Sequence, residues 1–413
     1  MKTLVITDKY FPKAHANSIC IQNVIEKLQE MGHECDVLAY RDTGIKSIKE
    51  YHGISVKYIK PDFRTRLFYY TENKPNAKFV KLADFLAISL NRLKKMIMLP
   101  FFPLYSISCP KRIFKKAMEM HRANNYDMVI SVYCPFDAVL GAYWFKKKNE
   151  KVKWCIYSVD TFINYRYSFL KNRGNNNRWL FKFLDLADGF IYMKSRENEY
   201  NNERFTKWRN KMYVSDIPCM IENLADGMSN QINNNSDDWI YAGALYSPHY
   251  NSDDLIKIFL NLPSDRRRVL HFYSSGRELE ELKHYEIETE GKIQCHEFVP
   301  HDELLKIYQS ANVLVSMKYT AQISAKIFEY MSYKKPVLHI SGTIEDPNAI
   351  YINQYSKGLV INAFDGSSLK HKVNKVVEWI ENINEVDSSL DEDFFIMNYP
   401  EYTATMLLKM VEK

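Results

Sequence analysis

The chain has 413 residues, of which 46% are hydrophobic and 26% charged, a globular composition in a chain too long for one core. Its formal net charge of +6 is too small to indicate a partner such as nucleic acid. No apolar run reaches the roughly 18 residues that a membrane-spanning helix needs. The seven cysteines form no Cys-x-x-Cys pair, so we expect reduced thiols, no structural metal site and a cytoplasmic location.

Strand-like and helix-like runs alternate through the first half of the chain. Residues 3–7 and 33–40 are predicted to be strands. Between them, the helical spacing of the apolar residues Ile21, Val24, Ile25 and Leu28 predicts a helix over 18–31 that ends at Gly32. This order is a βαβ unit, which builds a parallel sheet. Further strands are expected at residues 127–132, 153–159, 189–193 and 212–216.

The segment 78–122 has a different composition from its surroundings. Basic residues flank the apolar run "MIMLPFFPLY"; they are Lys94, Lys95, Lys111, Arg112, Lys115 and Lys116. A basic amphipathic helix pair is typical of proteins that lie on an anionic membrane surface, and we expect that contact at residues 90–116. The alternative is an ordinary amphipathic helix pair that packs on its own core.

The alternating pattern starts again after the polar stretch 229–238, which is typical of a linker. We expect strands at residues 238–245, 268–276, 292–300, 312–317 and 335–340. The sequence therefore predicts two α/β domains with doubly wound parallel sheets. Their expected limits are 1–225 and 226–390, followed by a C-terminal helix at 391–413 that returns to the first domain.

The stretch "SAKIFEYMSYKKPVLHI" begins at Ser324, a candidate N-cap for the helix that follows. The unpaired amides of the first turn and the positive end of the helix would then suit a diphosphate, together with the Lys326 ammonium. Glu329, one turn later, could accept hydrogen bonds from ribose hydroxyls. The alternative is a surface ion pair between Lys326 and Glu329, which would stabilise the helix by roughly 0.3 kcal/mol.

Other nucleotide and hydrolase signatures are absent from the sequence. There is no Gly-x-Gly-x-x-Gly after a leading strand, no phosphate-binding GxxxxGK[ST] and no GxSxG elbow. What remains is the rule that doubly wound sheets bind ligands beyond the carboxyl ends of their strands.

Several segments resemble glycosyltransferase family 4. The stretch from Ser324 is similar to the family pattern "PSKxFEYMxxGKPVL", and "HEFVPHDELLKIYQSANVLVSM" (296–317) to "GxVPxxELxxxYxxADVxV". "WIYAGALY" (239–246) resembles the opening of the family's second domain, and residues 5–40 its first strand, loop and helix. The resemblance implies the GT-B fold, two Rossmann-like domains that face each other across a cleft.

The resemblance also implies roles for particular residues. Lys326 would neutralise the donor diphosphate, Glu329 would hold the ribose, and Asp160 would contact the acceptor or the transferred sugar; these three are the expected catalytic residues. For Asp160, an N-cap or loop carboxylate is the alternative. The resemblance also places Asn17, Ser18, Gly243, Ser275 and Gly276 at the donor site. Further donor-site candidates are Ser324, as the helix N-cap, and Lys318 and Arg277, as additional positive charges.

The chain also departs from the family pattern. Ala321 stands where many members have an acidic residue, and "YSPHYNSDD" lacks the usual Arg and Lys, so that only His249 is available there. The usual glycine in the loop 14–18 is absent too. Lys318 or Arg277 would then supply the remaining positive charge.

The predicted function is transfer of a sugar from a nucleotide-diphosphate donor to a glycan or polyprenyl-linked acceptor, in capsule, O-antigen or exopolysaccharide synthesis. We expect retention of configuration and neither metal nor cofactor, at the inner face of the membrane. Stabilising the leaving diphosphate, which takes the acceptor proton, would be the main catalytic task. The alternatives are a non-catalytic subunit with the same fold and a nucleotide-sugar epimerase.

Overall fold

The computed structural model describes residues 1–11, 16–39, 48–60, 63, 66–67, 80–104, 106–162, 173–221, 237–243, 245, 250–265, 267–274, 277–297, 299–383, 386 and 392–412; for residues 84, 95, 173–177, 277, 278 and 392 it describes only the backbone. The candidate residues Ser275, Gly276 and His249 and the expected domain boundary at 225/226 lie outside this set.

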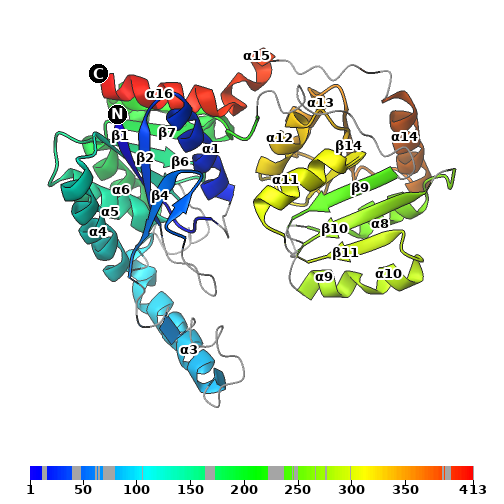
Figure 1. Cartoon of the computed structure of the whole chain (residues 1–413), viewed down its shortest axis with the longest axis horizontal. Coiled ribbons are helices and arrows are strands. Elements are labelled where there is room, and N and C mark those ends of the chain that lie inside the picture. Colours follow the sequence, from blue (N-terminus) through cyan, green and yellow to red (C-terminus); the bar gives the residue numbers. More distant parts are fainter. Residues whose placement is uncertain are drawn as a thin grey trace. The chain divides into compact units, whose positions relative to one another are not determined.

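The chain divides into two compact units, each with its own sheet (Figure 1). The first unit comprises Met1–Pro218 together with Pro400–Lys413, and the second comprises Cys219–Tyr399.

The first unit is built on an eight-stranded sheet in the order β3-β4-β2-β1-β5-β6-β7-β8. All its pairs are parallel except β3 with β4. The strands are β1 (Lys2–Ile6), β2 (Glu34–Ala39), β3 (Glu50–Tyr51), β4 (Ile54–Tyr58), β5 (Met128–Tyr133), β6 (Lys153–Ser158), β7 (Gly189–Met193) and β8 (Met212–Ser215). The helices are α1 (Ala16–Glu30), α3 (Val80–Met98), η1 (Leu99–Phe101), α4 (Ser108–Asn124), α5 (Phe136–Lys146), α6 (Arg173–Leu186), η3 (Lys194–Arg196), α7 (Glu197–Tyr200), η4 (Glu203–Lys211) and α16 (Pro400–Glu412).

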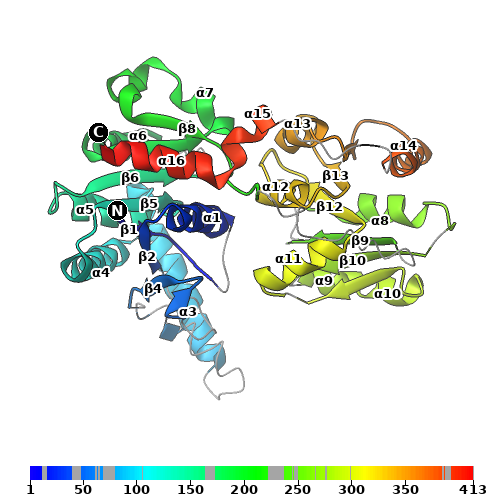
Figure 2. The ribbon, with the colours of Figure 1, turned by 45° about the horizontal axis from the view of Figure 1, so that its top comes forward.

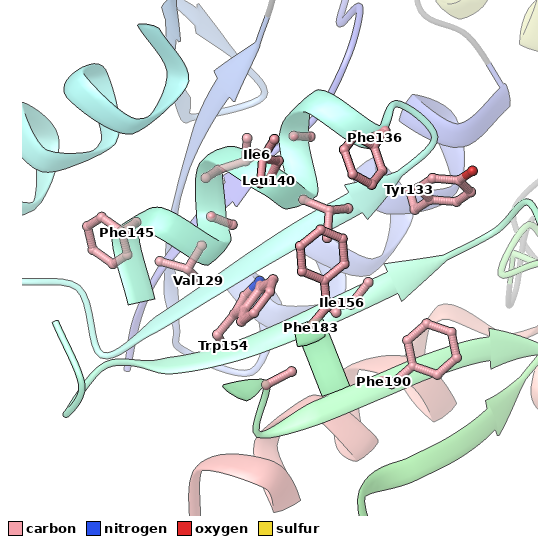
Figure 3. Close-up of a cluster of buried hydrophobic side chains, with 14 of the residues drawn as sticks. Ile6, Val129, Tyr133, Phe136, Leu140, Phe145, Trp154, Ile156, Phe183 and Phe190 are labelled. Atoms are coloured by element: carbon pink, nitrogen blue, oxygen red, sulfur yellow. The ribbon is translucent and has the colours of Figure 1, made fainter. Parts of the chain in front are cut away.

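The core of the first unit explains why its central strands are continuous apolar runs. Every residue of β5 is buried, as expected for a parallel strand covered on both faces. Figure 3 shows Val129 of β5 and Trp154 and Ile156 of β6 packed with Phe183 of α6. The Trp154 indole donates a hydrogen bond to the Ser131 hydroxyl at 2.9 Å, so its polar atom is also satisfied.

Helix α1 follows the predicted pattern. Its apolar residues, including Ile21, Val24 and Leu28, are buried, which confirms the predicted face. Gly32 follows the helix with a φ of +81°, a backbone conformation that costs glycine little and other residues more.

The second unit has a six-stranded sheet, parallel throughout, in the order β11-β10-β9-β12-β13-β14. The strands are β9 (Asp237–Ala242), β10 (Arg268–Tyr273), β11 (Ile293–His296), β12 (Val313–Lys318), β13 (Val337–Ser341) and β14 (Gly358–Asn362). The helices are α8 (Asp253–Leu260), α9 (Arg277–Leu282), α10 (His284–Glu288), α11 (His301–Ser310), α12 (Ala325–Ser332), α13 (Pro347–Asn353), α14 (Leu369–Asn382), α15 (Glu392–Phe395) and η5 (Ile396–Asn398).

In both sheets the first strand lies in the middle and the chain winds outward to both sides, which is the doubly wound topology. The predicted fold class is therefore confirmed. The sequence did not predict β3, β4 or β14, which are short and lie at or next to the sheet edges. The predicted strands 268–276 and 292–300 were too long, because β10 and β11 end at Tyr273 and His296.

The C-terminal segment was expected to be one helix and is instead interrupted. Residues Glu392–Asn398 belong to the second unit, whereas α16 begins at Pro400 and belongs to the first. Proline favours the first position of a helix because it lacks an N–H, so a new helix begins here. In Figures 1 and 2, α16 (red) lies alongside α1. Among the described residues no helix is both long and apolar enough to cross a membrane.

Candidate functional site

The middle of the second sheet is the place where its topology predicts a ligand site. β9 lies between β10 and β12, and the chain leaves β9 toward β10 first and reaches β12 later. In doubly wound sheets ligands bind beyond the carboxyl ends of the strands at such a switch point. The strand ends here are Ala242 of β9 and Lys318 of β12, and α12 follows the loop after β12.

Lys326 on α12 reaches this switch point. Its ammonium donates a hydrogen bond to the carbonyl oxygen of Ala242, the last residue of β9. Burial lowers the pKa of Lys326 to about 8, although the negative charge of Glu329 offsets part of the shift. The lysine therefore carries a proton at neutral pH, beside the backbone turn where a phosphate could approach it.

Gly243 makes room for this ammonium. A Cβ atom at this position would lie 3.0 Å from the Lys326 Nζ and 3.1 Å from the Tyr241 hydroxyl oxygen. Both separations are tighter than ordinary contacts, so with a larger residue here the Lys326 ammonium and the Tyr241 hydroxyl would have to shift by a few tenths of an ångström. The structure thus brings Gly243 and Lys326 together.

Glu329 is 3% exposed, and its partner is not Lys326. Its Oε1 lies 3.1 Å from the Nε2 of His301, the first residue of α11. Among the described residues no ion pair joins Lys326 to Glu329, so the alternative of a surface pair between these two is wrong. The sequence did not single out His301, because no spacing rule connects the start of α11 to the middle of α12.

Ser324 occupies the N-cap position of α12, but its hydroxyl makes no capping hydrogen bond. Its backbone N–H donates instead to the Asn348 side chain at 2.7 Å. The Asn348 amide in turn donates to the carbonyl oxygen of Gln322 at 2.9 Å and to Asp346 at 2.7 Å. Asp346 also bonds the fully buried His339 at 2.8 Å. This network holds the loop that precedes α12, and sequence patterns gave no sign of it.

The other side of this loop is held by two aromatic residues. The Lys318 ammonium is buried, donates to the Tyr250 hydroxyl at 3.1 Å and lies 4.6 Å from the centre of that ring. The Tyr319 hydroxyl donates to Asp254 at 2.6 Å. Lys318 is therefore next to the site, but its charge already contacts an aromatic ring. Ala321, in the same loop, is exposed.

In the first unit, two of the candidate residues lie together. The Asn17 amide at the start of α1 donates to the Asp160 carboxylate at 3.0 Å, and Asp160 follows β6 and is exposed. Ser18 is different, because it is buried and its hydroxyl donates to the backbone carbonyl of Lys9. Ser18 thus stabilises the protein's own loop rather than facing a ligand. Arg277 begins α9, and its side chain lies outside the described residues.

The side chains that could bind a metal ion are those of His, Cys, Asp and Glu. Within the described residues, no group of three or more His, Cys, Asp or Glu side chains is arranged to hold a metal ion. None of the cysteines among these residues forms a disulfide.

Comparisons with known proteins agree with this geometry. Residues 236–378, which form most of the second unit, match the family model described as Glycosyl transferases group 1. No curated protein sequence matches the chain.

Solved structures resemble the chain over its whole length. Sucrose-phosphate synthase from Thermosynechococcus elongatus has a TM-score of 0.61 at 12% identity, covering 100% of this chain and 98% of the other. WaaG, described as a glycosyltransferase involved in lipopolysaccharide biosynthesis, has a TM-score of 0.53 at 13% identity, covering 98% and 99%. UDP-GlcNAc 2-epimerase from Neisseria meningitidis, bound to UDP-GlcNAc, has a TM-score of 0.56 at 11% identity, covering 100% and 99%.

At such identities the structural similarity shows the fold alone, and the family match concerns residues 236–378 of the second unit. The chain therefore has the GT-B fold, and its residues 236–378 match the glycosyl transferases group 1 model.

Proposed function

We propose that this protein transfers a sugar from a nucleoside-diphosphate donor to a hydroxyl of a glycan or polyprenyl-linked acceptor, with retention and without a metal or cofactor. The observation that carries the proposal is the Lys326 ammonium, held on the Ala242 carbonyl at the switch point of the second sheet. The match of this unit to the glycosyl transferases group 1 model supports it.

The reaction would proceed at the diphosphate. The acceptor oxygen bonds to the anomeric carbon as the bond from that carbon to the diphosphate breaks, and the acceptor proton passes to the diphosphate. Lys326 and the unpaired amides at the start of α12 would stabilise the charge that develops on the leaving group. Glu329 would hold the ribose, and Asp160, oriented by Asn17, would contact the acceptor or the transferred sugar.

The proposed pathway is the synthesis of a cell-surface polysaccharide such as capsule, O-antigen or exopolysaccharide. Two similar structures are described as an outer core galactosyltransferase of lipopolysaccharide, WaaB, and as the lipopolysaccharide enzyme WaaG. An acceptor of this kind lies at the cytoplasmic face of a membrane, so the protein would have to bind that surface.

Helix α3 is the element that supports membrane binding. Its large apolar residues Leu82, Phe85, Leu86, Leu93, Met96 and Ile97 are 44–71% exposed and recur three or four residues apart, so they share one face. The helix carries four basic residues and one acidic residue, a charge that complements anionic lipids. In Figures 1 and 2 it extends away from the rest of the first unit.

Helix α4, the second member of the expected pair, behaves differently. Its apolar residues Ile113, Ala117 and Met120 are buried, and it packs against α5. This is the alternative that the sequence left open for the whole segment. We therefore place the proposed membrane contact on α3, with exposed Phe101 and Ile107 beyond it, and not on the apolar face of α4.

The test is binding and turnover of a panel of nucleotide sugars in the presence of a chelator. We expect one donor to bind and be slowly hydrolysed, with both properties lost in Lys326→Ala and Glu329→Ala. His284→Ala, on α10 and outside the site, serves as the control.

Other outcomes would favour the alternatives. Interconversion of a UDP-sugar without an acceptor would favour an epimerase. No binding, or binding that neither substitution affects, would favour a non-catalytic subunit. The anomeric configuration of the product, read by NMR, would test retention.

A further inference from the structure

We propose that His301 is a positioning residue that orients the Glu329 carboxylate for recognition of the donor ribose. This inference rests on the proposed function, because it assumes a nucleotide at the switch point of the second sheet. The family resemblance carries no role for His301, and the assignment comes from the contact between α11 and α12.

The geometry fixes the two side chains relative to each other. Pro300 is the N-cap residue of α11, and His301 follows as the first residue of that helix. Its Nε2 lies 3.1 Å from the Glu329 Oε1, with 20% of the histidine side chain exposed and 4% of the glutamate side chain. One carboxylate oxygen of Glu329 is thus engaged from one side.

The second carboxylate oxygen of Glu329 can accept further hydrogen bonds. Within the described part of the chain, the His301 contact is the one hydrogen bond of this carboxylate. A carboxylate accepts several hydrogen bonds, and a buried charge is costly unless it is fully paired. Two ribose hydroxyls would provide the missing donors, and His301 would determine which way the oxygens point.

The groups around the pair act on the pKa of His301 in opposite directions. Burial by itself lowers the pKa of His301, but the hydrogen bond and charge of Glu329, with a contribution from Asp302, outweigh burial and raise it. The Lys326 charge opposes this rise. Tyrosines 308, 330 and 333 also sense the Glu329 charge, and burial, the largest cause, raises the pKa of each hydroxyl, so they stay neutral.

The test compares nucleoside diphosphates with their 2′-deoxy counterparts. Dissociation constants are measured for UDP, GDP, ADP and CDP and for the four deoxy forms, and the ratio of deoxy to ribo constants reports ribose recognition. We expect His301→Ala to lower this ratio by roughly tenfold, the loss of one charge-assisted hydrogen bond, as Glu329→Gln does. His284→Ala should leave it unchanged.

A second variant separates the effect of the hydrogen bond that His301 donates from the effect of its charge. In His301→Gln the side-chain amide can still donate to Glu329 but does not titrate, so the ratio should stay near the wild-type value. In the wild type the ratio should fall as pH rises through the raised pKa of His301, because Nε2 of the neutral imidazole can lose the hydrogen that it donates to Glu329. His301→Gln keeps its N–H donor at every pH, so its ratio should not fall. The direct effect of Lys326 on the diphosphate is shared by the ribo and deoxy forms, and His301→Gln, which keeps Lys326, controls for the rest of its titration.

The outcomes are distinguishable. If His301→Ala weakens ribo and deoxy forms equally, or leaves the ratio unchanged, His301 has only a structural role and the inference is wrong while the proposed function stands. If Glu329→Gln leaves the ratio unchanged, the inference is wrong as well. If the wild type binds none of the nucleotides, the proposed function fails and the inference falls with it. Unfolding temperatures of all variants control for loss of the fold.

Discussion

The ammonium of Lys326 lies where burial makes its proton easier to lose. Its pKa is lowered from the ordinary value of 10.5 to about 8, so the free protein carries this charge below about pH 8 and loses it above. We therefore predict that affinity for a nucleoside diphosphate falls as pH rises through about 8. Calorimetric titration between about pH 6.5 and about pH 9.5 measures this dependence.

The matched variant for this prediction is Lys326→Arg, because a guanidinium stays protonated throughout that range. Its affinity is expected to be nearly independent of pH on the alkaline side. The same alkaline fall in Lys326→Arg as in the wild type would assign the titration to another group.

At the scale of elements, the loop before α12 depends on one buried amide. Asn348 is fully buried, accepts from the Ser324 N–H and donates to the Gln322 carbonyl. In Asn348→Ala both backbone groups lose their partner, and each costs about 1–3 kcal/mol if left unpaired. We predict a lower free energy of unfolding and a higher KM for the donor, measured by urea denaturation and initial rates.

Asn382→Ala is the control for that variant, since Asn382 lies on α14 and its amide bond to the Glu378 carbonyl is exposed. Its stability and KM should be close to those of the wild type. A change in stability for Asn348→Ala without any change in KM would mean that the loop does not position the donor.

Helix α3 exposes a row of apolar residues to water. An exposed apolar patch of this kind is unfavourable in water and typically marks a surface that binds a membrane or a partner. We predict that Phe85→Ser, Leu93→Ser and Met96→Ser combined abolish sedimentation with vesicles that contain anionic lipid. Arg92→Gln alone should weaken binding roughly fivefold, the effect of about 1 kcal/mol per basic residue.

Ile287→Ser provides the comparison, because Ile287 on α10 is more exposed than any of these residues but stands alone. It should bind vesicles like the wild type. Unchanged binding of the triple variant would place the membrane contact elsewhere or exclude it.

At the scale of the whole molecule, each unit has its own core, and the last helix of the chain completes the first one. Leu407 and Met410 of α16 are buried, and Thr403 bonds Ser215 of β8 at 2.6 Å. A Cβ on Gly189 of β7 would lie 2.3 Å from the Met410 sulfur, so α16 packs tightly on this sheet.

We therefore predict that a chain ending at Tyr399 loses protection from hydrogen exchange in α1, β7 and β8 while β9 to β14 keep theirs. The reason is that removing α16 exposes apolar surface of the first unit only. An equal loss of protection in both units would show that they unfold as one.

The sequence alone determined the features that depend on local pattern. Buried parallel strands are continuous apolar runs, so β5, β6, β7 and β12 could be located within one or two residues. The apolar face of α1 followed from its helical spacing, whereas the motif that contains Lys326 and Glu329 was singled out by its resemblance to glycosyltransferase family 4. Short strands such as β3 and β14 carry too few residues to form a recognisable period.

The tertiary structure alone decided which side chains meet. Asn17 bonds Asp160, 143 positions away, and Glu329 bonds His301 rather than the lysine on its own helix. It also decided that α4 buries its apolar face while α3 does not, although both are basic and amphipathic. Such choices follow from strand order and from the surfaces that neighbouring elements offer, and neither is encoded in the spacing of residues along one segment.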